Sequence, residues 1–119
     1  MGHSQAKRAA SHARILAEAA ADIRARALDP LAVARLMRRA GLTHGGFYGH
    51  FASRADLLAQ ALACALADGD ARARAATSFA GFVRAYLSDA HRDAPQEGCA
   101  LAALVSELAH ADAACRSVA

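Results

Sequence analysis

The chain has 119 residues, of which 55% are hydrophobic and only 5% aromatic, and its formal net charge at pH 7 is +3. This composition is typical of a small globular protein and excludes a disordered acidic or collagen-like chain. Residues 1–13 are polar and basic, and no apolar run approaches the length of a membrane span, so we expect a cytoplasmic protein with no membrane contact.

Residue types that carry catalysis or bind metals are poorly represented. The three cysteines, Cys64, Cys99 and Cys115, are an odd number without Cys-x-x-Cys spacing, so we expect reduced thiols, with Cys64 as a small core residue and the other two exposed. The six histidines lack paired metal-ligand spacing, and no phosphate loop, nucleophile elbow or spaced carboxylate pair is present. We therefore expect no enzyme, no metal site and no cofactor.

Two amphipathic helices are predicted in the first 40 residues. Apolar side chains at helical spacing, including Ile15 and Ile23, predict a helix over residues 11–27. A second helix is predicted over residues 30–40, with Asp29 as its N-cap and Pro30 in its first turn, because those residue types are favoured there. Arginines 35, 38 and 39 fall on its more exposed sides.

Residues 40–51, AGLTHGGFYGHF, are the most informative segment. Gly41 follows the second helix and predicts a positive-φ turn, and Thr43 is placed to cap a third helix from about residue 44. Spacing by four residues places Phe47 and Phe51 in the core. The side of this helix that we expect to face outward consists of His44, Gly45, Tyr48 and His50.

Three glycines in this short helix, Gly45, Gly46 and Gly49, are unfavourable by roughly 1 kcal/mol each relative to alanine. Glycine allows another surface to approach the backbone closely, as the floor of a DNA major groove would require. Without its flanking helices, however, the segment is equally compatible with an ordinary glycine-rich loop over buried aromatic side chains.

Further helices are predicted beyond this segment. Ser53 and Asp56 have capping-box spacing and predict a fourth helix over residues 54–67, which ends near Gly69. Apolar spacing predicts helices over residues 78–87 and 101–108, separated by a charged loop at residues 88–98. We expect the last of these helices to be the most exposed. The fold class is therefore all-α, with a three-helix helix-turn-helix head.

Charge divides unevenly along the chain. Residues 1–56 contain nine Lys and Arg against four Asp and Glu, whereas residues 57–119 contain five against seven, so the two parts carry +5 and −2. A basic head on a slightly acidic body is typical of DNA-binding proteins, although an unevenly charged solvated surface would give the same count.

Residues 14–62, RILAEAAADIRARALDPLAVARLMRRAGLTHGGFYGHFASRADLLAQAL, resemble the amino-terminal domain of TetR-family transcription regulators. The resemblance implies that residues 43–50 form the recognition helix. Positions that typically grip backbone phosphates are matched by Tyr48, His50 and Arg54, and also by the capping Thr43. Positions nearest the base edges are matched by His44, Gly45 and Gly46. Leu31 and Ala32 depart from the family pattern, which often has a DNA-contacting hydroxyl residue there.

This resemblance implies a DNA-binding domain over residues 1–53 and a partial, truncated ligand-binding and dimerisation domain over residues 54–119. The function expected from it is a homodimeric repressor that binds a palindromic operator in double-stranded DNA and is released by a small apolar effector. The effector-binding residues are unknown from the sequence. The alternative is a shortened regulator that pairs with a longer relative or lacks autonomous function.

Overall fold

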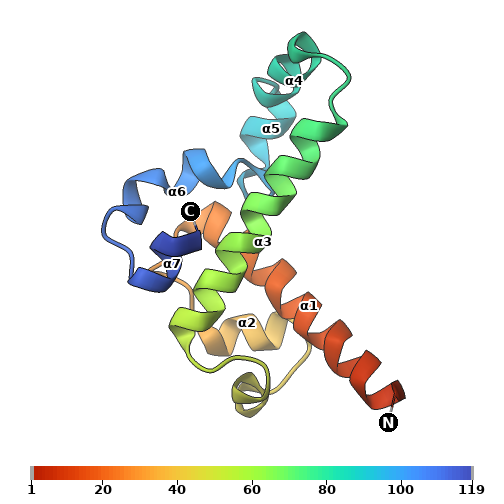
Figure 1. Cartoon of the computed structure of the whole chain (residues 1–119), viewed down its shortest axis with the longest axis vertical. Helices are drawn as coiled ribbons and strands as arrows, with labels where there is room; N and C mark the ends of the chain where they lie inside the picture. Colours follow the sequence, from red (N-terminus) through yellow and green to blue (C-terminus); the bar gives the residue numbers. More distant parts are fainter. Residues whose placement is uncertain (1, 119) are drawn as a thin grey trace.

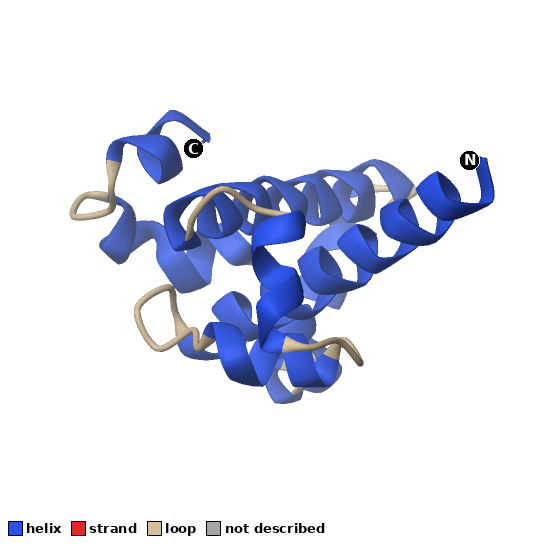
Figure 2. Ribbon diagram, turned by 90° about the horizontal axis from the view of Figure 1, so that it is seen from below, coloured by secondary structure: helices blue, strands red, loops and turns tan. Residues whose placement is uncertain are grey.

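A computed structural model describes residues 2–118, so Met1 and Ala119, the outer limits of the two expected domains, lie outside the described range. Within that range the chain is all-α and has no strand (Figure 2). The elements are α1 (Gly2–Arg26), α2 (Val33–Arg39), the 3-10 helix η1 (His44–Gly49), α3 (Arg54–Ala75), α4 (Phe79–Tyr86), α5 (Asp89–Asp93), the 3-10 helix η2 (Pro95–Glu97), α6 (Ala100–Leu108) and α7 (Ala113–Val118).

The two longest helices, α1 and α3, pack against each other and supply about half of the core (Figure 1). Ile15 and Ile23 from α1 and Leu57 and Leu62 from α3 are fully buried. Helix α2 and η1 lie at the end of α3 where it begins, whereas α4 and α5 lie at its other end (Figure 1). Thus α3 joins the predicted recognition segment to the rest of the chain.

The first two helices differ from the predicted ranges. Helix α1 begins at Gly2, nine residues before the predicted start, because Lys7, Arg8 and the alanines around them are good helix formers. The predicted cap of the second helix is wrong. Residues Asp29 and Pro30 form a turn, and α2 begins at Val33 after Ala32, which has no side chain that can cap it.

Helix α3 is also longer than predicted. Ser53 caps it as expected, since its hydroxyl accepts a hydrogen bond from the Asp56 backbone N–H at 3.1 Å. Instead of ending near Gly69, the helix continues to Ala75. Gly69 has no positive φ, and the alanine-rich sequence around it favours helix strongly enough to offset one glycine.

The carboxy-terminal part has more structure than the sequence indicates. The predicted loop contains α5 and η2, whose short helical turns are too brief to show apolar periodicity, and α7 was not predicted. Helix α6 is half exposed as expected, with Leu101 and Val105 more than half accessible and Leu104 buried. The expectation that Cys115 is exposed is wrong, because α7 folds back on α3 and buries this side chain.

A buried carboxylate joins α1 to α2. The side chain of Asp22 is only 4% exposed, and three arginine guanidinium groups surround it: Arg26 at 3.7 Å, Arg35 at 3.5 Å and Arg39 at 3.8 Å. Two of these arginines belong to α2, so the ion pairs fix the position of α2 on α1. The sequence predicts Arg35 and Arg39 on the more exposed sides of the second helix. In the structure both form ion pairs with Asp22 while their side chains stay partly exposed.

We expect Asp22→Asn to lower the free energy of unfolding by about 1–2 kcal/mol, because three partly exposed arginines lose their buried counter-charge and solvent screens part of the loss. Urea denaturation of the variant and of an Asp29→Asn control, which changes an exposed carboxylate, provides the measurement. Equal destabilisation by the two substitutions would contradict a structural role for Asp22.

Candidate nucleic-acid interface

The turn between α2 and η1 is a Schellman motif. Gly41 has φ +76°, as predicted for the turn. Its N–H donates to the Arg38 carbonyl at 3.0 Å, and the Leu42 N–H donates to the Met37 carbonyl at 2.8 Å. These bonds satisfy the last carbonyl groups of α2 and direct the chain into η1, so the predicted helix-turn-helix geometry rests on this glycine.

The segment that follows is a 3-10 helix rather than the predicted α-helix. Three glycines in six residues weaken α-helical hydrogen bonding, and 3-10 geometry is common in such short pieces. Thr43 occupies the N-cap position, as predicted, but its hydroxyl makes no capping hydrogen bond; its carbonyl accepts the Gly46 N–H at 3.2 Å instead. The predicted capping role of the Thr43 side chain is therefore wrong.

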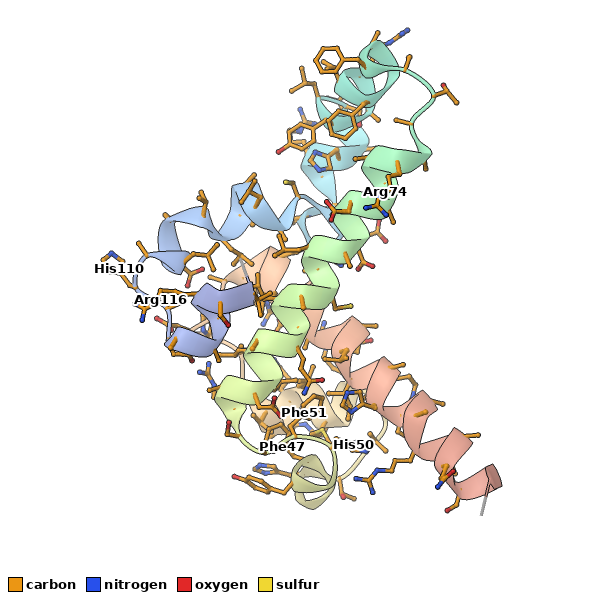
Figure 3. The ribbon with its side chains drawn as sticks, viewed as in Figure 1. Phe47, His50, Phe51, Arg74, His110 and Arg116 are labelled. Carbon is orange, nitrogen blue, oxygen red and sulfur yellow. The ribbon has the colours of Figure 1, made fainter. Side chains whose placement is uncertain are left out.

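Two aromatic side chains attach η1 to the core, as the sequence predicts. Phe47 and Phe51 are each 2% exposed, and their rings stack with centroids 5.6 Å apart (Figure 3). The Phe47 carbonyl accepts hydrogen bonds from both His50 and Phe51. Tyr48 contacts the edge of the Phe47 ring but is itself 74% exposed. One side of η1 is thus fixed to the core by Phe47 and Phe51, and the opposite side is exposed.

That outer face includes Thr43, His44 and Tyr48, which are all exposed. A Cβ atom built on Gly45 or Gly49 would meet nothing within 4 Å, and one on Gly46 would make only ordinary contacts with Thr43 and Met37. None of these three glycines has a positive φ. The packing of the described chain therefore does not require glycine at these three positions. A side chain added there would instead change the shape of the outer surface of η1.

His50 does not face outward as predicted. Its ring lies 5.7 Å from that of His12 in α1 and 6.3 Å from that of Phe51, and its Nδ1 is buried without a hydrogen-bond partner among the described residues (Figure 3). Burial, followed by the nearby charges of His12 and Arg8, lowers the pKa of His50. His50 follows the last residue of η1, and the backbone there directs its side chain back towards α1. The prediction treats residues 44–50 as one continuous helix and therefore places His50 on the outer face.

Arg54 hydrogen-bonds the backbone of the turn before α2. Its Nη2 donates to the backbone carbonyls of Leu28 at 3.0 Å, Asp29 at 2.9 Å and Leu31 at 3.2 Å. These carbonyls belong to the turn between α1 and α2. The predicted phosphate-gripping group is thus engaged in holding the chain that precedes α2.

Two residues at this site were missed from the sequence. Arg8 donates to the Gly49 carbonyl, and His12 hydrogen-bonds Gln60 at 3.1 Å and stacks on Phe51. Both tie α1 to the end of η1 and the start of α3. They lie about 40 residues or more from their partners in the chain, so local spacing carries no signal of the contact.

Three basic side chains on α1 and α2 are exposed, although one of them, Arg8, also donates to the Gly49 carbonyl. Lys7 and Arg8 on α1 and Arg38 on α2 are exposed, and Arg38 forms no ion pair within residues 2–118. In the same range, no group of three His, Cys, Asp or Glu side chains is arranged to hold a metal ion. None of the described helices is both long enough and apolar enough to cross a membrane.

Comparison with known protein families finds a match to the amino-terminal part of the chain. Residues 15–61 match the family model described as bacterial regulatory proteins, tetR family. The matched residues run from the buried part of α1 through the turn and η1 into the first turns of α3. No curated protein matches the chain.

The half-buried position of His50 predicts a pH-dependent stability. Because its pKa is lower in the folded chain than the ordinary value of 6.5, the unfolded chain binds the proton more readily. We expect the free energy of unfolding to fall as pH drops below about 6.5, and His50→Gln to reduce that fall. Urea denaturation across this range, with exposed His44→Gln as the control, tests it; an unchanged pH slope in His50→Gln would refute the assignment.

Proposed function

We propose that this chain is a DNA-binding transcriptional regulator, as the match of residues 15–61 to the tetR family supports, and that it acts as a homodimeric repressor released from its operator by a small apolar molecule. The observation that carries the proposal is the exposed, glycine-rich outer face of η1, held by Phe47 and Phe51 after a tight turn. We propose a regulatory rather than a catalytic role. Because its DNA partner lies in the cytoplasm of a bacterial cell, we also propose a cytoplasmic location.

The DNA contacts that we propose follow the exposure of each side chain. His44, Gly45 and Gly46 approach the base edges, since they lack bulk or project outward, and Thr43 and Tyr48 contact phosphates. The exposed cations Lys7, Arg8 and Arg38 add sequence-independent attraction. His50 and Arg54 support this surface from behind through the contacts described above. In functional terms, residues 1–53 then form the DNA-binding head and residues 54–119 the regulatory part.

Self-association is supported by apolar side chains on the surface of the regulatory part. Phe79 is 83% exposed and Leu87 is 75% exposed at the two ends of α4, and Leu101 and Val105 are exposed on α6. Large apolar side chains gathered on a surface often mark a protein interface. We propose that a dimer presents two η1 segments to one face of a palindromic duplex.

Release by an effector is supported by a cavity of about 660 Å³ bounded by α3, α4 and the start of α6. This volume is within the range of small-molecule sites. Its wall includes Leu66, Phe82, Tyr86 and Leu101, with a few polar groups among them. The cavity lies at the end of α3 opposite η1 (Figure 1), so a molecule bound there contacts the helix that begins beside the DNA-binding face.

Selection of binding sites from a random duplex pool tests the function. We expect enrichment of a palindrome whose half-sites lie about 34–36 Å apart or a multiple of that distance. Affinity for the enriched site should fall as salt rises, because phosphate contacts release counterions. A single enriched half-site would favour the alternative, a regulator that pairs with a longer relative; enrichment of no sequence would contradict specific DNA recognition.

Replacement of Gly45 by glutamine separates docking from folding. A side chain at this position meets nothing inside the described chain, so we expect unchanged thermal stability. It would stand between η1 and the groove, and affinity for the selected duplex should fall roughly tenfold. Gly69→Gln is the matched control, because Gly69 also has open space around its Cβ position but lies in the middle of α3.

Fluorescence anisotropy with a labelled duplex provides the affinities, and circular dichroism the melting temperatures. Equal affinity for Gly45→Gln and the unmodified chain would mean that η1 does not approach DNA through its glycine face. A lower melting temperature for Gly45→Gln alone would mean that the glycine serves the fold instead.

A further inference from the structure

One wall of the cavity between α3, α4 and α6 contains a nucleophile. Cys99 is half-buried, lines this cavity and stands at the N-cap of α6, where its Sγ accepts the Ala102 N–H at 3.5 Å. Tyr86 lines the same cavity. A thiol that accepts a backbone N–H at a helix N-cap, beside a space large enough for a small molecule, has the surroundings of a reactive cysteine.

The groups around Cys99 favour its thiolate form. Burial opposes ionisation, but the Ala102 N–H, the Tyr86 hydroxyl, the Leu101 N–H and the charge of Arg72 outweigh it and lower the pKa of Cys99. Burial instead raises the pKa of Cys64, and it raises the pKa of Cys115 to about 11. The pKa of Cys99 thus shifts in the opposite direction to those of Cys64 and Cys115, which serve as internal comparisons.

Aromatic side chains shape the space in front of this sulfur. Tyr86 lies between Phe82 and His91, with ring centroids at 5.9 Å and 4.7 Å respectively. All three side chains line the cavity together with Cys99. Flat, unsaturated molecules pack well against aromatic faces, so the cavity favours such a molecule over a saturated, branched one.

We propose that this cavity captures aromatic α,β-unsaturated carbonyl compounds and that Cys99 forms a covalent adduct with them. This inference rests on the proposed function, since it names the chemical class of the effector. The thiol of Cys99 first gives its proton to water. Its sulfur then forms a bond to the β-carbon of the ligand, the carbon–carbon π pair moves to form an enolate, and the enolate takes a proton from water. The net change is addition of S–H across the double bond.

Helix α6 connects this reaction to the DNA-binding head. Its first residues line the cavity, while Glu107 in its last turn accepts the Leu28 N–H at 3.3 Å, beside the carbonyls that Arg54 holds. The chain just before Cys99 is fixed from two sides, because Arg24 donates to the Gln96 carbonyl at 2.7 Å and Arg72 to the Gly98 carbonyl at 2.9 Å. An adduct at Cys99 that shifts α6 therefore alters the support of the turn before α2.

Reaction of the purified chain with cinnamaldehyde tests the capture step. We expect peptide mass spectrometry to find the adduct on Cys99 about tenfold faster than on Cys64 or Cys115, and no fast adduct in Cys99→Ser. Serine retains a side chain that can cap α6. The unreactive alcohol 3-phenylpropan-1-ol should slow the cinnamaldehyde reaction by occupying the cavity, but slow that of the small reagent iodoacetamide less.

Similar reaction rates for the three cysteines in the folded chain would overturn the proposal. An alcohol that slows both reagents equally, or neither, would overturn the aromatic cavity as its cause. Phe82→Ala, checked for folding by circular dichroism, provides a second measure: it should slow cinnamaldehyde but not iodoacetamide.

DNA affinity tests the consequence. We expect the Cys99 adduct to weaken binding to the selected duplex about tenfold or more, within the usual range of coupling between two sites. Cys99→Ser should bind the duplex like the unmodified chain and keep its affinity after cinnamaldehyde treatment. An adduct that leaves affinity unchanged would overturn the regulatory role of Cys99. Failure of the untreated chain to bind any duplex would refute the proposed function, whereas the reaction rates would still decide the capture step.

Discussion

The backbone between α1 and α2 depends on side chains from distant parts of the chain. Ala27 ends α1 with φ +81°, a left-handed conformation that is unfavourable by about 1–2 kcal/mol for an L-residue with a Cβ atom. Two side chains hold the turn that follows. Arg54 from α3 donates to three of its carbonyls, and Glu107 from α6 accepts the Leu28 N–H. Charge-assisted hydrogen bonds of this kind are stronger than neutral ones and offset the local strain. The placement of α2, and therefore of η1, depends on them.

The segment η1 combines weak local structure with strong anchoring. Three glycines make η1 a poor helix by itself, and 3-10 hydrogen bonds are less favourable than α-helical ones. Phe47 and Phe51 compensate by burial against the core, and Arg8 and His12 fasten the end of the segment to α1. The outer side of η1 can thus lack bulky side chains while the segment keeps a fixed position on the core.

The regulatory part is joined to the head by helices that end in both regions. Helix α3 begins at the capping Ser53 next to η1 and extends to the cavity, and α6 runs from the cavity to the turn before α2. Helices transmit displacement along their axes better than loops because each turn is hydrogen-bonded to the next. This arrangement connects the cavity to η1 through α3 and to the turn before α2 through α6.

Local sequence determined the elements whose signals are contained in a few neighbouring residues. The positive φ of Gly41, the cap at Ser53 and the inward positions of Phe47 and Phe51 all follow from short-range sterics, capping and helical period, and the structure confirms each of them. The all-α class and the helix-turn-helix head follow from the same signals and from the resemblance of residues 14–62 to a known family.

Tertiary contacts decided the rest. His50 turns inward because α1 offers His12, and Arg54 is engaged by carbonyls about 25 residues earlier in the chain. Cys115 is buried by a helix with too few residues to show a period, and Asp22 forms ion pairs with two arginines of α2 that stay partly exposed. The sequence by itself therefore determined the principal helices and the internal positions of Phe47 and Phe51. Only the tertiary structure decided which polar side chains remain free, because a partner many residues away leaves no pattern in the local spacing.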